Sequence, residues 1–200
     1  RMASILGHND DVRAYREAAK AIKQAFREAY FDADQVKVAG DCQTSTACML
    51  YQGLHEEHEA APLLDLLLQQ QPEKDNHQDT GILGNKYLYN VRGEAGRMDI
   101  AMQMVLNETY PSFRNWMDQG ATTLWECWNG GGSQNHHMFS DISAVMYKYL
   151  AGIKPDETAP GFKHIIMNPA INCGLQSLKC SHESPQGPIE VQWNHTEDSV

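Results

Sequence analysis

A single carboxylate framed by two indoles is the feature of this sequence best suited to chemistry. Glu126 lies between Trp125 and Trp128 in the segment 120–130, and His136 follows ten residues later within an Asn-His-His triplet. Aromatic rings stack on the apolar C–H face of a pyranose, and a carboxylate activates water by accepting its proton. The pattern therefore suits an enzyme that holds a sugar ring and activates water against it, although spacing alone does not favour this interpretation over its alternative. The alternative is a buried tryptophan pair with an incidental acid on a loop.

Two other groups of reactive side chains do not have the spacing of a site. His55 and His58 are three residues apart, whereas the zinc motif of metalloproteases needs histidines at i and i+4. That segment instead predicts a solvated, charged start of a helix. The five cysteines form no C-x-x-C pair, which argues against a zinc site or a disulfide scaffold. Cys127 has no neighbouring base, so it is predicted to be a packed thiol. No metal or cofactor is expected.

Composition places the chain among soluble globular proteins. Its 200 residues are 42% hydrophobic and 21% charged, enough for one core and part of a second. The sequence holds no apolar run long enough for a membrane span, and no signal peptide is visible. The formal net charge of -10 argues against nucleic acid as a partner, because phosphates would be repelled.

The elements that must position these residues are mostly helical. Apolar side chains recur at helical spacing through the first three quarters of the chain, between segments rich in glycine and polar residues. The expected helices cover residues 1–6, about 10–30, 44–54, 57–71, 82–89, 94–108, 112–118 and 139–151.

The apolar period changes from helical to two residues after Pro155. Strands are expected at 162–168, 178–182 and 189–193, with a type I turn over residues 184–187. Helices followed by strands predict two domains, at 1–153 and 160–200, with the boundary in a stretch of prolines and glycines. Three strands are too few for a closed sandwich, so the chain is expected to be a piece of a larger protein.

Several motifs, in order, resemble those of one enzyme family. They are D-T-G-I-L-G-N-K-Y-L from residue 79, Y-P-S-F-R-N-W-M from residue 110, G-A-T-T-L-W-E-C-W from residue 120, N-H-H-M-F from residue 135 and A-G-I-K-P from residue 151. In this order they resemble the C-terminal half of the bacterial α-L-rhamnosidases, glycoside hydrolase family 78. The resemblance covers about residues 42–193. A mainly α fold is implied: part of an (α/α)₆-barrel-type toroid, followed by the start of an antiparallel β-sandwich.

The resemblance also assigns roles to residues. Glu126 corresponds to the general base of an inverting glycosidase, and the acidic segment that carries the family's general acid is not found in this chain. His136 matches the histidine that contacts rhamnose; the alternative is a histidine that caps the helix starting near residue 139. Trp125 and Trp128 are expected to form the sugar platform, with at least one of them in the core. The neighbouring His137 is expected to pack.

The implied protein is a bacterial hydrolase of rhamnose-containing glycosides, either cytoplasmic or periplasmic. Two alternatives stay open: another inverting (α/α)₆ glycosidase with a different sugar preference, and a non-catalytic helical scaffold that binds carbohydrate. The isolated chain is expected to be inactive. Its inner helix faces, carrying Ile100, Met104, Val145 and Tyr149, are expected to be uncovered, so that the chain pairs with itself as a homo-oligomer or with the rest of the barrel.

Overall fold

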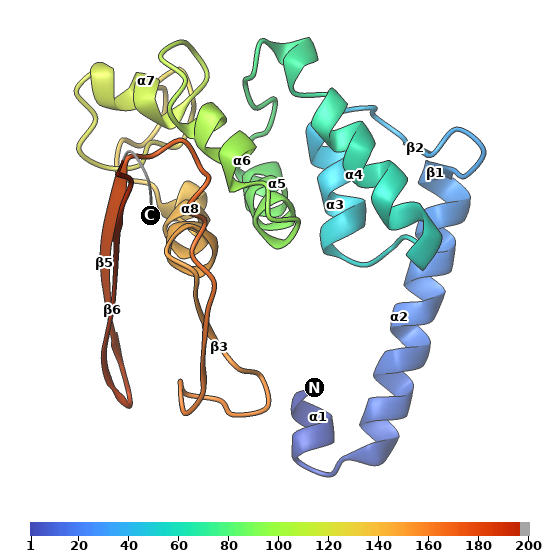
Figure 1. Cartoon of the computed structure of the whole chain (residues 1–200). Coiled ribbons are helices and arrows are strands. Elements are labelled where there is room, and N and C mark those ends of the chain that lie inside the picture. Colours follow the sequence, from blue (N-terminus) through green and yellow to red (C-terminus); the bar gives the residue numbers. More distant parts are fainter. Residues whose placement is uncertain (197–200) are drawn as a thin grey trace.

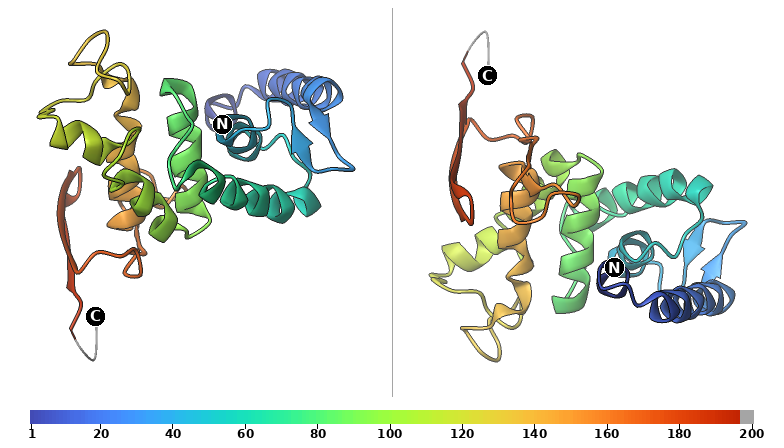
Figure 2. Two further views of the ribbon diagram at one scale, coloured as in Figure 1. Left: turned by 90° about the horizontal axis from the view of Figure 1, so that it is seen from above. Right: turned by 90° about the horizontal axis from the view of Figure 1, so that it is seen from below.

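The computed structural model describes residues 1–196 and shows helices through the first three quarters of the chain and paired strands in the last (Figure 1). The elements form an open arc, with α1 (Met2–Ile5) and α2 (Asn9–Tyr30) at one end and the hairpin of β5 (Ser177–Ser184) and β6 (Gly187–Asn194) at the other (Figure 1). Seen from above and below, α2 and this hairpin lie on opposite sides of the molecule (Figure 2). The α-helices are α1 (Met2–Ile5), α2 (Asn9–Tyr30), α3 (Gln43–Tyr51), α4 (Ala60–Gln69), α5 (Ile82–Glu94), α6 (Met98–Val105), α7 (Phe113–Asp118) and α8 (Asp141–Val145). Shorter turns are η1 (Glu57–Glu59), η2 (Pro72–Lys74), η3 (His137–Phe139) and the π-helical η4 (Met146–Leu150).

Helix α5 is the centre of the arc, since it contacts α3, α6 and α8. Two of its glycines make this close packing possible. A Cβ atom at Gly84 would overlap the side chain of Thr44 on α3, and one at Gly93 would overlap the ring of Tyr149 on η4. Because neither atom exists, α3 and η4 approach the α5 backbone directly.

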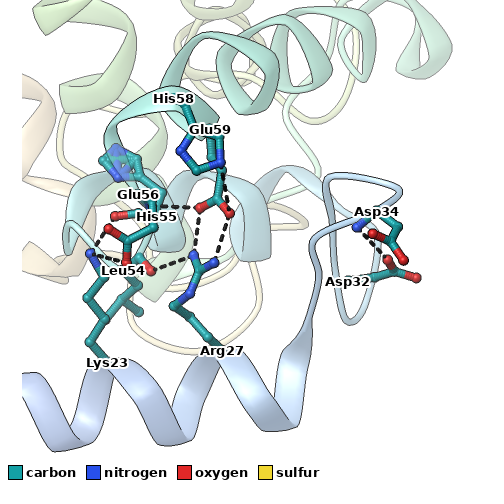
Figure 3. Close-up of polar contacts among 9 residues, drawn as sticks. All are labelled: Lys23, Arg27, Asp32, Asp34, Leu54, His55, Glu56, His58 and Glu59. Carbon is teal, nitrogen blue, oxygen red and sulfur yellow. Dashed lines mark hydrogen bonds and ion pairs between the residues drawn. The ribbon is translucent and has the colours of Figure 1, made fainter.

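Helix α2 is attached by polar contacts and by the partly buried Phe26, which packs against the cluster of Val38, Met49 and Leu63, rather than by fully buried side chains. None of its 22 residues is buried. Arg27 donates two hydrogen bonds to Glu59, at 2.6 and 2.8 Å, and Lys23 donates to the carbonyl of His55 at 2.6 Å (Figure 3). The prediction that residues 55–59 form a solvated helix start is therefore wrong for Glu59, whose side chain is 4% exposed. Its helical spacing could not reveal a partner 32 residues away.

The strands form three antiparallel pairs: β1 (Phe31–Asp32) with β2 (Lys37–Val38), β3 (Ile153–Pro155) with β4 (Ile165–Met167), and β5 (Ser177–Ser184) with β6 (Gly187–Asn194). The last pair has the predicted alternation, because Ile189, Val191 and Trp193 are buried while their neighbours on β6 are exposed. Residues 185 and 186 form the turn between Ser184 and Gly187, which pair with each other.

Pairing begins earlier along the chain than the sequence predicted. The strands β1, β2 and β3 precede residue 162, and the predicted strand at 162–168 is reduced to three residues. Strands of two or three residues show too little alternation to be recognised. The predicted helix at 139–151 is likewise divided into η3, α8 and η4, and the one at 94–108 begins only at Met98, after the positive φ of Gly96.

The main core lies between α5, α6, α7, α8 and the strands, and a second cluster joins Val38, Met49 and Leu63. Met104, Val145 and Tyr149 are buried in the main core, so the prediction that they are uncovered is wrong. The elements that carry them, α6, α8 and η4, all pack on α5. Exposed apolar side chains lie elsewhere, including Ile22 and Tyr15 on α2. Among the described residues, no helix has both the length and the apolar character of a membrane span.

Candidate active site

The candidate site lies on the long loop between α7 and η3. The N–H of Glu126 donates to the carbonyl of Ser133 at 2.8 Å, and the N–H of His136 donates to the carbonyl of Leu124 at 2.8 Å. These two hydrogen bonds hold residues 124–126 beside residues 133–136. The backbone pairing thus brings the carboxylate and the imidazole together, although they are ten residues apart in sequence.

The Glu126 carboxylate is held at one oxygen and accessible at the other. Its Oε2 accepts a hydrogen bond from the backbone N–H of Ser133 at 2.8 Å and lies 3.8 Å from Nδ1 of His136. Within residues 1–196, Oε1 accepts no hydrogen bond. The side chain is 41% exposed, and that of His136 is 30% exposed. An accessible carboxylate with a free oxygen is able to accept a proton from water.

His136 occupies the position that precedes η3, but its ring makes no capping hydrogen bond. The side chain faces Glu126 instead, which leaves the capping alternative without support in the structure. His137 is exposed, with its ring stacked 6.1 Å from that of His136, so the prediction that it packs is wrong. Cys127 is also exposed, contrary to the packed thiol that was predicted. Both residues lie on a loop that contacts the core through its tryptophans, so their own side chains stay exposed.

The two tryptophans of the motif pack against aromatic side chains of the core. Trp125 is 7% exposed, and its ring lies 5.8 Å from that of Trp116. Trp128 is half-buried, with its ring 4.4 Å from Trp116 and 4.5 Å from Phe139. One of the two was expected in the core, and Trp125 is there. Their use as a sugar platform stays a prediction.

The indole N–H groups tie the loop to the helices. Trp128 Nε1 donates to the carbonyl of Thr80 at 2.7 Å, and Trp116 Nε1 donates to the carbonyl of Trp128 at 2.9 Å. Thr80 and Ser133 were missed by the sequence reasoning because each acts through its backbone. The only available signal for Ser133 was its place directly after three glycines. Among the described residues, no group of three or more His, Cys, Asp or Glu side chains could hold a metal.

Two family models match consecutive parts of the chain. Residues 1–150 match the bacterial alpha-L-rhamnosidase 6 hairpin glycosidase domain, and residues 152–200 match the bacterial alpha-L-rhamnosidase C-terminal domain. Together these models account for nearly the entire sequence.

Relatives and solved structures agree with these matches. An alpha-L-rhamnosidase from Alteromonas sp. (strain LOR) is 34% identical over 205 residues, covering 96% of this chain and 22% of the relative. Two solved structures superpose with a TM-score of 0.88 over 98% of this chain. One is the Streptomyces avermitilis alpha-L-rhamnosidase complexed with L-rhamnose, 29% identical, and the other is the Dictyoglumus thermophilum enzyme, 33% identical. They confirm the predicted fold class.

The chain spans only about a fifth of the length of these proteins: 22% of the Alteromonas relative, 20% of the Streptomyces structure and 22% of the Dictyoglumus structure.

Proposed function

This chain belongs to the bacterial α-L-rhamnosidase family, and from that premise we propose that it forms part of an enzyme that releases terminal α-L-rhamnose from glycosides. The observation that carries the proposal is the accessible Glu126 carboxylate beside His136, on a loop of the domain that matches the glycosidase model. A structural neighbour of the same fold holds L-rhamnose, which supports this choice of sugar.

In the proposed reaction Glu126 is the general base of an inverting hydrolysis. The carboxylate accepts a proton from water while the water oxygen forms a bond to the anomeric carbon. The bond from that carbon to the aglycone oxygen breaks, and the aglycone oxygen takes a proton from a second carboxylic acid. Inversion requires the two carboxyl groups to be about 6.5–9.5 Å apart, so that water fits beside the base. We place the second acid outside these 200 residues, because the acidic segment that carries the family's general acid is not found among them.

His136 is the proposed sugar contact. Its Nδ1 lies 3.8 Å from Glu126 Oε2, and the ring is partly accessible. A hydroxyl group of the substrate bound at this ring would lie next to the base, where the attacking water must also be. The imidazole then orients the sugar relative to Glu126.

We also propose that residues 1–153 are one part of the (α/α)₆ catalytic domain and residues 160–200 the start of a C-terminal β-sandwich. The two family-model matches divide the chain at nearly the same place, which supports this organisation. The remainder of the catalytic domain would complete the sugar pocket. The isolated 200-residue chain should therefore release no measurable nitrophenol from nitrophenyl α-L-rhamnoside.

The test uses the complete protein that carries this chain. It should hydrolyse nitrophenyl α-L-rhamnoside, and NMR of the first product should show rhamnose with the inverted anomeric configuration. Nitrophenyl glycosides of other sugars serve as controls for the sugar preference. Hydrolysis of those sugars in preference to rhamnose would overturn the substrate assignment, and retention of configuration would overturn the mechanism.

A further inference from the structure

The Glu126 carboxylate can occupy its position only because residue 132 is a glycine. A Cβ atom at Gly132 would lie 2.5 Å from Glu126 Oε2 and 3.0 Å from its Cδ, closer than such atoms pack. The residue also has a φ of +73°, which disfavours any side chain. We infer that Gly132 is a positioning residue for Glu126, and that it fixes which carboxylate oxygen meets the water. This inference rests on the proposed function.

Gly132 acts together with the residue that follows it. The N–H of Ser133 donates to Glu126 Oε2 at 2.8 Å, while the carbonyl of Ser133 accepts the N–H of Glu126 at 2.8 Å. Two hydrogen bonds therefore join the same two residues, one through the backbone of Glu126 and one through its side chain. To make the second bond, Oε2 lies where it would be only 2.5 Å from a Cβ atom at residue 132, so a methyl group there would displace it.

As a consequence, the two carboxylate oxygens of Glu126 have different roles. Oε2 is occupied by the Ser133 N–H and lies near His136, whereas Oε1 accepts no hydrogen bond among residues 1–196. Oε1 is therefore the atom that takes the proton from water. Displacing the carboxylate from Gly132 would move Oε1 away from the water of the proposed reaction without removing the base itself.

The other glycines of this region provide controls. Gly120 has a φ of +88°, and a Cβ there would meet no atom within 4 Å. Gly120→Ala thus carries the same kind of backbone strain as Gly132→Ala but leaves the carboxylate untouched. Comparing the two variants separates strain from displacement of Glu126.

The experiment measures kcat and KM of the complete protein on nitrophenyl α-L-rhamnoside. Because general bases contribute about 10²–10⁴-fold, Gly132→Ala should lower kcat by roughly tenfold to a hundredfold with little change in KM. Gly120→Ala should keep kcat within about threefold of the wild type, since it loses no catalytic contact. Equal losses in the two variants, or an unchanged kcat in Gly132→Ala, would overturn the inference.

Azide distinguishes a misplaced base from general damage. Azide is already an anion, so it attacks the anomeric carbon without a base and gives rhamnosyl azide as the aglycone leaves. Azide should raise the turnover of Gly132→Ala and of Glu126→Gln, and should leave Gly120→Ala unchanged. If Gly132→Ala folds poorly, azide should still raise the turnover of the fraction that is folded. An unchanged turnover of that variant in azide contradicts the inference.

A further comparison separates this inference from the proposed function. Adding Gly132→Ala to Glu126→Gln should cause no further loss of kcat, because the positioned group is already absent. A wild-type protein without rhamnosidase activity would overturn the proposed function. An active wild type with an inactive Glu126→Gln variant, combined with full activity in Gly132→Ala, would overturn only the role of Gly132.

Discussion

Two glutamates of this chain are held in opposite ways. Glu59 is 4% exposed, both of its oxygens accept hydrogen bonds from Arg27, and Oε2 also accepts the backbone N–H of Glu56 at 2.7 Å (Figure 3). Glu126 is 41% exposed and, among residues 1–196, has one backbone donor and no arginine partner. The hydrogen bonds from Arg27 lower the pKa of Glu59 to about 2. Glu59 is thus a fixed anion, whereas Glu126 keeps a free oxygen.

The difference shows what separates a carboxylate with a structural role from one that is able to react with water. The segment 55–59 has more ionisable side chains than the segment around Glu126, yet its buried carboxylate has its acceptor sites occupied by an arginine and a backbone N–H. Reaction with water needs an accessible lone pair, and Glu126 has one. The number of charged residues in a segment is therefore a poor guide to a catalytic site. Whether the carboxylate oxygens already accept hydrogen bonds from the protein is a better one.

The largest effect that would test this contrast is expected at Glu126. In the complete protein, Glu126→Gln should lower kcat on nitrophenyl α-L-rhamnoside by about 10²–10⁴-fold, because the amide cannot accept the water proton. KM should change much less, since a base acts in the transition state. Steady-state kinetics measures both values. Turnover like that of the wild type would show that another residue activates the water.

At Glu59 the effect should fall on stability instead. Glu59→Gln leaves the Arg27 guanidinium without its anion and should cost about 3 kcal/mol, the lower end of the range for a broken buried pair, because Arg27 is 20% exposed. Faster hydrogen exchange of the α2 backbone amides would show this loss of stability in the helix that the pair holds. The kcat of the folded enzyme should be unchanged. A loss of kcat comparable to that of Glu126→Gln would show that the two glutamates do not differ in role.

Acid should weaken the wild type more than the Glu59→Gln variant. The pKa of Glu59 is about 2 in the folded chain and about 4.5 when unfolded, so the folded state favours the anion. Its stabilisation is complete above about pH 5 and is lost as the pH falls toward 2. A pKa shift of this size corresponds to about 3 kcal/mol. Urea unfolding from pH 6 to pH 2.5 should show the two proteins converging, and parallel curves would contradict the shift.

Trp128→Phe should have a smaller effect than either glutamate substitution. The phenyl ring keeps the packing against Trp116 and Phe139 but loses the hydrogen bond to the carbonyl of Thr80. A buried carbonyl left without its donor costs about 1–2 kcal/mol, which a shift of the urea midpoint would show. A large rise in KM at unchanged stability would indicate instead that Trp128 stacks on the sugar.

The smallest effect is expected at an exposed pair. Arg114 donates to both oxygens of Asp118 on α7, at 2.8 and 2.9 Å, and both side chains are open to solvent. Water and salt screen such a pair, so Asp118→Asn should leave the urea midpoint unchanged within error. A shift as large as that of Glu59→Gln would show that burial does not distinguish the two ion pairs.

The sequence by itself determined the family, the longer helices, the terminal strand hairpin and the segment that carries Glu126, but not the short strands β1, β2 and β3. The features that it determined depend on local information: helical spacing, the alternation of residues 189, 191 and 193, and motifs in a fixed order. Such patterns are visible within a window of a few residues. The catalytic roles of Glu126 and His136 stay predictions, because they depend on a bound sugar and on the second acid of the proposed reaction.

The tertiary structure alone decided which charges are neutralised and which side chains are free. The contact between Arg27 and Glu59 spans 32 positions, and the covering of Met104, Val145 and Tyr149 depends on helices that meet only in the folded chain. The place of His136 beside Glu126 follows from backbone hydrogen bonds within a loop, which leave no mark on residue type. Burial and pairing are properties of distant neighbours, and a local pattern does not contain them.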